Sequence, residues 1–128
     1  RWTEQVLGRE VTDVFAPGDG SALAISGGDI LRLDGRLWTV ALSVGSAGAR
    51  LVALHGSSAT DVWAVGEAGG ALHRGPTGDW ARADIPDGGS LSDVFVLSPS
   101  DAWAVASSSG TAWHWNGTGW SPIPCLCC

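Results

Sequence analysis

An internal repeat of about forty residues constrains the fold of this chain more than any other feature of its sequence. Three similar segments each close on a tryptophan, and these lie 42 and 40 residues apart, at Trp38, Trp80 and Trp120. The pentapeptide DVWAV at Asp61–Val65 returns as DAWAV at Asp101–Val105. A repeat of this length is one supersecondary unit that cannot bury its apolar face alone, so such units pack in succession. The sequence therefore predicts one repeat domain over residues 1–124.

Each unit has the pattern of four short strands. An apolar strand comes first, an Ala- and Val-rich strand suited to burial on both faces follows, and the fourth strand begins at the recurring Trp. The dipeptides Asp34–Gly35 and Asn116–Gly117 predict two-residue hairpin turns, because Gly and Asn tolerate positive φ. No segment keeps a 3.6-residue apolar period, so no helix is expected. Four-stranded units at this spacing are typical of β-propeller blades.

The sequence thus predicts an all-β fold of three four-stranded antiparallel propeller blades, with an extra N-terminal strand at residues 2–7. The blades are expected at about residues 10–42, 50–85 and 90–123. Closed propellers have roughly four to eight blades, so the ring is incomplete and both end sheets expose an apolar face. We therefore expect either the remainder of a longer propeller or association of copies into a closed ring or a head-to-tail fibre. The extra strand favours association, because it can pair with an exposed edge of another chain.

The repeats resemble those of bacterial β-propellers. The resemblance rests on the pattern L-x-x-V … S-x-x-D-V-W-A-V-G-x-x-G … L-H … (D/N)-G-x-x-W and extends from Trp2 to about Ile123. Similar repeats occur in Asp-box or sialidase-like propellers, in photosystem II assembly factor propellers and, more distantly, in kelch propellers. No copy matches the strict Asp-box S-x-D-x-G-x-T-W, and residues 75–79 stand where a two-residue turn is expected. The resemblance implies the fold and leaves the activity open, because propellers host many unrelated functions.

Composition argues against several classes of function. The net charge is −6 and the seven cationic side chains are all Arg, whereas nucleic-acid binding needs clustered Lys and Arg. No apolar run approaches about 20 residues, so no transmembrane segment is expected. Because no zinc, phosphate-loop or serine-hydrolase motif is present, we expect neither a metal nor another cofactor.

The cysteines form a tail at residues 125–128, as Cys125, Cys127 and Cys128. This C-x-C-C arrangement lacks the paired spacing of a structural zinc site. A tail without a role, a disulfide within the tail or between chains, and ligation of a metal or other cofactor all stay open, and the odd number favours a bond to another chain. With the Lys-free acidic composition and the absence of an initiator Met, the tail favours an extracellular or cell-surface location.

Residues that occur in one repeat only are the candidates for ligand binding, because residues repeated in every blade serve the blade itself. The recurring tryptophans are therefore assigned to packing between blades. His55 lies on an innermost strand where the other copies have Phe, so it either faces a central channel or is a half-buried, hydrogen-bonded histidine. His73 and His114 occupy matching places, which favours a structural role, although two histidines one blade apart can also share a ligand.

The remaining residues of this kind are Glu67, Arg74, Trp113 and Trp115. Trp113 and Trp115 share one face of a strand by the two-residue alternation. If exposed, the pair offers a platform for a sugar ring; if covered, it packs under the neighbouring blade. Asp61 and Asp101 recur after turns and suit bonds to local backbone N–H groups. A sialidase-type nucleophile is missing because the chain has no Tyr, and no pair of acids is singled out by its spacing.

These observations predict a non-catalytic interaction or assembly module that self-associates through its open blade ends. The alternative is a carbohydrate-binding, lectin-like propeller that uses exposed Trp, and a more distant alternative is an enzyme resembling a glycoside hydrolase. The expected partner is accordingly a further copy, the rest of a longer propeller, or a glycan.

Overall fold

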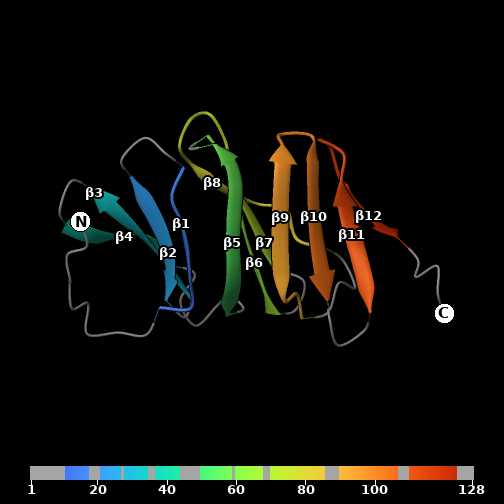
Figure 1. Cartoon of the computed structure of the whole chain (residues 1–128), viewed down its shortest axis with the longest axis horizontal. Helices are drawn as coiled ribbons and strands as arrows, with labels where there is room; N and C mark the ends of the chain where they lie inside the picture. The colour runs from blue at the N-terminus through green and yellow to red at the C-terminus, as the bar shows by residue number, and fades with distance from the viewer. Residues whose placement is uncertain are drawn as a thin grey trace.

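The structure is a computed structural model that describes residues 11–17, 21–26, 28–34, 37–43, 50–58, 60–67, 70–85, 90–106 and 110–123. Twelve strands in these ranges form three four-stranded antiparallel sheets, which lie in a row along the long axis of the molecule (Figure 1). The prediction of three four-stranded blades is confirmed. The expected strand at residues 2–7 and the cysteines Cys125, Cys127 and Cys128 lie outside the described residues.

Each sheet pairs its strands in chain order, so every connection within a sheet joins neighbouring strands. Sheet 1 contains β1 (Asp13–Phe15), β2 (Ala22–Ser26), β3 (Asp29–Asp34) and β4 (Leu37–Ser43). Sheet 2 contains β5 (Leu51–Ser58), β6 (Asp61–Gly66), β7 (Ala71–Arg74) and β8 (Trp80–Arg82). Sheet 3 contains β9 (Asp93–Ser98), β10 (Asp101–Ala106), β11 (Thr111–Trp115) and β12 (Trp120–Ile123). In the described part of the chain, no helix has the length and apolar character needed to cross a lipid bilayer.

The turn between β11 and β12 differs from the two-residue turn that Asn116–Gly117 predicts. Trp115 pairs with Trp120, so the connection has the four residues 116–119. The Asn116 side-chain Oδ1 accepts the backbone N–H of Thr118 at 2.9 Å and that of Gly119 at 3.0 Å. Gly117 has φ of 103°, a conformation that glycine adopts without strain. Asn116 therefore shapes this turn through its side chain, as Asn does in many turns.

Sheet 2 is covered on both faces, which explains the uninterrupted apolar character of its second strand. Every residue of β6 is buried. Val62 and Ala64 pack into a core shared with sheet 1, whereas Trp63 and Val65 pack into a core shared with sheet 3. A strand between two layers reads as a continuous apolar run instead of an alternating one. Sheet 2 thus has the environment of an interior propeller blade.

The two end sheets are not alike, and this corrects the expectation of an open apolar face at both ends. On the face of sheet 1 that points away from sheet 2, Ala24 and Leu31 are only 1% and 3% exposed, while Val14 and Val40 are exposed at the rim of that face. On the face of sheet 3 that points away from sheet 2, Phe95 is 52% exposed. Sheet 1 is closed at the centre of its outer face, and sheet 3 is open.

Candidate functional site

The inner strands β1, β5 and β9 lie next to one another and carry a column of three rings. The ring of His55 stacks on Phe95 at a centroid distance of 4.8 Å and lies 5.5 Å from Phe15 on the other side. His55 Nδ1 accepts the backbone N–H of Val96 in sheet 3 at 2.9 Å. His55 is half-buried. This arrangement corresponds to the hydrogen-bonded, half-buried histidine among the two alternatives for His55, and it joins sheet 2 to sheet 3.

A carboxylate makes the corresponding link between sheets 1 and 2. Oδ1 of Asp13 accepts the N–H of Val14, and Oδ2 accepts the N–H of Leu54 across the junction, both at 2.9 Å. Asp93 occupies the same place in sheet 3, where its Oδ1 accepts the N–H of Val94 at 2.9 Å. Within the described part of the chain, Oδ2 of Asp93 has no hydrogen-bond donor. The link that Asp13 makes is therefore half complete at the open end.

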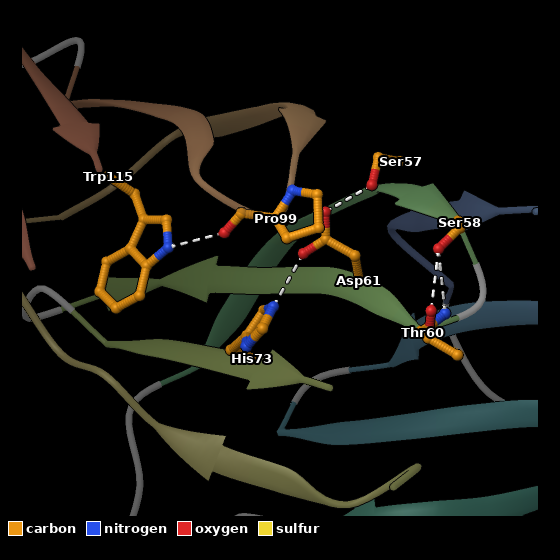
Figure 2. Close-up of polar contacts among 7 residues, drawn as sticks. All are labelled: Ser57, Ser58, Thr60, Asp61, His73, Pro99 and Trp115. Carbon is orange, nitrogen blue, oxygen red and sulfur yellow. Dashed lines mark hydrogen bonds and ion pairs between the residues drawn. The ribbon is translucent and has the colours of Figure 1, made fainter. Parts of the chain in front are cut away.

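His73 and His114 each bind an aspartate of their own sheet instead of sharing a ligand. Nε2 of His73 lies 2.8 Å from Oδ1 of Asp61, and Nε2 of His114 lies 2.8 Å from Oδ1 of Asp101. The Ser57 hydroxyl donates to the other oxygen of Asp61 (Figure 2). The recurring aspartates thus bind histidine rings, where bonds to local backbone N–H groups were expected.

Each of these histidines also packs on a tryptophan. The ring centroids of Trp63 and His73 are 4.5 Å apart, and so are those of Trp103 and His114. The Asp–His–Trp arrangement is therefore a repeated structural unit in sheets 2 and 3. In the described ranges no group of three or more His, Cys, Asp or Glu side chains is placed to hold a metal ion.

Trp113 and Trp115 lie on the face of sheet 3 that packs against sheet 2. Trp115 approaches Trp63 edge-on at 4.9 Å, and its indole N–H donates to the Pro99 carbonyl at 3.2 Å (Figure 2). Trp115 also lines a cleft of about 520 Å³ between sheets 2 and 3, together with Trp120, Thr118 and the paired Arg82 and Asp84. Of the two tryptophans predicted to form a sugar platform, only Trp115 is among the described residues that line this cleft.

The outer face of sheet 3, which we call the open face, is an apolar surface that comparison of the repeats singles out. Strand alternation and pairing place these residues on it: Phe95, Leu97, Trp103, Val105, His114 and Ile123. Four of these six are exposed apolar side chains: Phe95, Leu97, Val105 and Ile123. The residues of sheet 2 that correspond to Trp103 and Val105 are Trp63 and Val65, and both are fully buried under sheet 3.

The open face is therefore built like a surface between two blades, yet nothing in the described part of this chain covers it. The sequence analysis expected an exposed apolar face on this end sheet. The search for residues that occur only once did not name the members of that face, because they repeat. The signal that finds it is the comparison of repeats, in which the same residue types are buried in sheet 2 and exposed in sheet 3.

Comparison with solved structures identifies proteins of similar fold. No protein-family model and no curated protein sequence matches the chain. Among solved structures, YCF48 bound to a D1 peptide superimposes with a TM-score of 0.74 at 15% identity, over 90% of this chain and 39% of the other. YCF48 from Cyanidioschyzon merolae gives a TM-score of 0.71 at 18% identity, over 89% of this chain and 39% of the other.

The chain accordingly has the β-propeller fold, and it spans about two-fifths of the length of these two propellers. The resemblance of its repeats to those of β-propellers is confirmed at the level of the fold.

Proposed function

We propose that this chain is a non-catalytic propeller interaction module, and that the open face of sheet 3 binds a second copy of the chain. The observation that carries the proposal is the exposure of Phe95 and Val105 on a sheet face whose counterpart in sheet 2 is completely buried. Apolar patches of several hundred Å² on a soluble protein mark association surfaces. One structural neighbour is a propeller with a bound peptide, so a protein partner agrees with what this fold is able to hold.

The unlike ends of the row favour a closed dimer over a fibre. A head-to-tail fibre needs two complementary apolar faces on each copy, one at either end. Among the described residues, Ala24 and Leu31 are buried at the centre of the outer face of sheet 1, and Val14 and Val40 are exposed beside them. On the open face of sheet 3 the central Val105 is itself exposed, which makes that face the better candidate for association. Two open faces that meet across a two-fold axis satisfy each other, and association then stops at two copies.

Substitution of one exposed valine tests the proposal. Val105→Lys places a charge at the centre of the open face, and burial of an unpaired ammonium is strongly unfavourable, so the variant is expected to be monomeric. Val40→Lys makes the same change on the outer face of sheet 1, where Val40 is also exposed, and is expected to leave the association unchanged. Light scattering coupled to size exclusion, over a concentration series, measures the mass against the 13.1 kDa of one chain.

A wild-type chain that stays at the mass of a monomer over the whole series contradicts the proposal. Loss of association in Val40→Lys to the same degree as in Val105→Lys also contradicts it, because the effect would then come from charge and not from the open face.

Glycan binding is a second candidate function, and the cleft between sheets 2 and 3 favours it. Trp115 presents an aromatic surface there beside the polar groups of Thr118, Arg82 and Asp84, the combination with which proteins bind sugar rings. Binding on a glycan array that disappears in Trp115→Ala and persists in Val40→Lys supports this function. If the wild-type chain binds no glycan on the array, glycan binding is rejected as a function.

A further inference from the structure

A pocket of about 240 Å³ at the junction of sheets 1 and 2 carries two arginines. Arg32 of β3 and Arg74 of β7 both line it, together with Leu23, Thr39 and Trp80. None of the described residues that line the pocket is acidic. In a chain with 13 acidic and seven cationic side chains, two arginines in one pocket without an acid need an explanation.

The junction of sheets 2 and 3 provides an internal comparison, because the repeat places equivalent residues there. Its cleft has Trp115 where the first junction has Arg74, and Trp120 where the first junction has Trp80. Behind that cleft, Trp63 packs on His73 at 4.5 Å and meets Trp120 edge-on at 5.0 Å. Among the described residues that line it, the one arginine is Arg82, and its guanidinium lies 2.9 Å from the carboxylate of Asp84. The cleft at the second junction is thus backed by aromatic rings, and its arginine is paired with an acid.

Three substitutions within the repeat distinguish the first junction. Leu23 stands at the place of Trp63, Arg32 at the place of His73, and Arg74 at the place of Trp115. Two indoles and an imidazole are thereby replaced by one leucine side chain and two guanidinium groups. Trp80 is retained, so the first junction has a pocket that two arginines and an aromatic side chain line together.

The acid that would neutralise Arg32 has also been replaced. In sheet 2 the histidine at this place is held by Asp61, whereas Ser21 occupies the equivalent place in sheet 1. Within the described part of the chain, no ion pair joins Arg32 or Arg74 to a carboxylate. The Nε–H of Arg74 donates to the Gly78 carbonyl at 3.2 Å, which fixes the guanidinium and leaves its two terminal nitrogens for another acceptor.

We propose that this pocket binds a carboxylate, held by Arg32 and Arg74, with the apolar part of the ligand against Trp80. The planar fork of a guanidinium matches a carboxylate with two parallel N–H···O bonds. The net charge of −6 disfavours a polyanion and leaves a singly charged group as the acceptable ligand. The carboxylate belongs to a small aromatic or aliphatic acid or to the end of a peptide. The pocket lies at another junction than the open face, so the proposal does not depend on self-association.

Titration with matched probes tests the proposal. N-acetylphenylalanine supplies the carboxylate and a ring, N-acetylphenylalaninamide lacks only the charge, and inorganic phosphate supplies a different oxyanion. The acid is expected to bind at least about tenfold more tightly than the amide, because two charge-assisted contacts are lost with the charge. A pentapeptide that ends in phenylalanine, used as the free acid and as the amide, separates the two sources of the carboxylate. If the ligand is the end of a peptide, both the pentapeptide acid and N-acetylphenylalanine bind. If the ligand is a small acid, only N-acetylphenylalanine binds.

Variants locate the site. Arg32→Gln and Arg74→Gln are each expected to weaken binding of the acid about tenfold. Arg82→Gln removes the same charge from the neighbouring β8 outside this pocket and is expected to change nothing. Leu23→Trp restores the residue that the repeat has at Trp63, so it is expected to fill the pocket and abolish binding while the thermal unfolding midpoint stays at or above that of the wild type.

Three results overturn the proposal: equal binding of the acid and the amide, phosphate binding as tight as that of the acid, and a loss in Arg82→Gln equal to that in Arg32→Gln. Equal binding of the acid and the amide would show that the negative charge is not recognised. Equally tight binding of phosphate would show that the site is not selective for a carboxylate, and an equal loss in Arg82→Gln would show that binding is not located in this pocket. Self-association, measured in the same samples by light scattering, is expected to be unaffected by all four substitutions.

Discussion

At the scale of single residues, the repeat places the same side chains in two environments. Asp61 is buried between the Ser57 hydroxyl and the His73 ring, with 2% of its side chain exposed, whereas the side chain of Asp101, at the same place in sheet 3, is 41% exposed. Removal of a buried acceptor leaves its donors without a hydrogen bond in a site that water does not reach, and this lowers the free energy of unfolding. The two aspartates therefore have equal geometry toward histidine but unequal weight in stability.

Replacement of each aspartate by alanine measures this difference. Asp61→Ala leaves Ser57 and His73 without their partner in a covered site and is expected to lower the free energy of unfolding by about 3 kcal/mol. Asp101→Ala, where water replaces the lost partner, is expected to cost about 1 kcal/mol or less. Urea denaturation of both variants at one pH checks the order. Equal losses would show that the burial of Asp61 has no energetic consequence.

At the scale of elements, the end of β6 shows how closely the backbones of neighbouring strands in sheet 2 approach. A Cβ atom on Gly66 would lie 2.0 Å from the carbonyl oxygen of Arg50, which is backbone and has little room to yield. The Gly66 carbonyl also accepts the N–H of Leu91 at 2.9 Å, just before sheet 3 begins. The equivalent residue in sheet 3 is Ala106, so the repeat does not require glycine here in general. The close approach of Arg50 requires it.

Gly66→Ala is accordingly expected to destabilise the chain by about 2 kcal/mol, since the backbone around Arg50 must shift. Gly75→Ala is the matched control: a Cβ there meets nothing within 4 Å, so stability is expected to stay the same or rise slightly. Thermal and urea unfolding report both effects. Stability unchanged in Gly66→Ala would mean that the contact with Arg50 is easily relieved.

The strands could be predicted from the sequence, whereas the pocket could not. Recurrence of DVWAV and of the closing tryptophans determines strand number and order, because each repeat must form the same sheet. The four-residue turn at residues 116–119 escaped prediction because Asn116 acts through its side chain. The pocket depends on which residues of neighbouring repeats meet across a junction. Leu23, Arg32 and Arg74 have no visible relation until strand register places them together.

At the scale of the whole molecule, the row of sheets is closed at one end and open at the other. The core of sheet 2 is shared with both neighbours, while sheets 1 and 3 each have a neighbour on one side only in the described part of the chain. The two end sheets differ because Ala24 and Leu31 are buried on the outer face of sheet 1, whereas Phe95 and Val105 are exposed on that of sheet 3. An apolar surface left in water contributes nothing to stability until it is covered. Any process that covers the open face therefore stabilises the folded chain as a whole.

The midpoint of thermal unfolding is expected to rise with protein concentration, because association removes folded monomer from the equilibrium. In Val105→Lys the midpoint is expected to be independent of concentration, and in Val40→Lys to rise as in the wild type. Differential scanning calorimetry over a hundredfold range of protein concentration measures the midpoints. Such a range changes the contribution of association to the free energy of unfolding by roughly 2.7 kcal/mol, which is enough to resolve the difference. A wild-type midpoint that does not move would argue against coupling between folding and association.

The carboxylate of Asp93, of which one oxygen has a donor in the described part of the chain, bears on how a further sheet can join this row. Asp13 of sheet 1 accepts the backbone N–H of Leu54 in β5 and so links its own sheet to the next one. Asp93 presents the same acceptor at the outer margin of the last sheet. A further sheet that docked at this margin would meet in Asp93 the acceptor that Asp13 offers to Leu54, so the last sheet already carries one of the polar groups by which one blade joins the next.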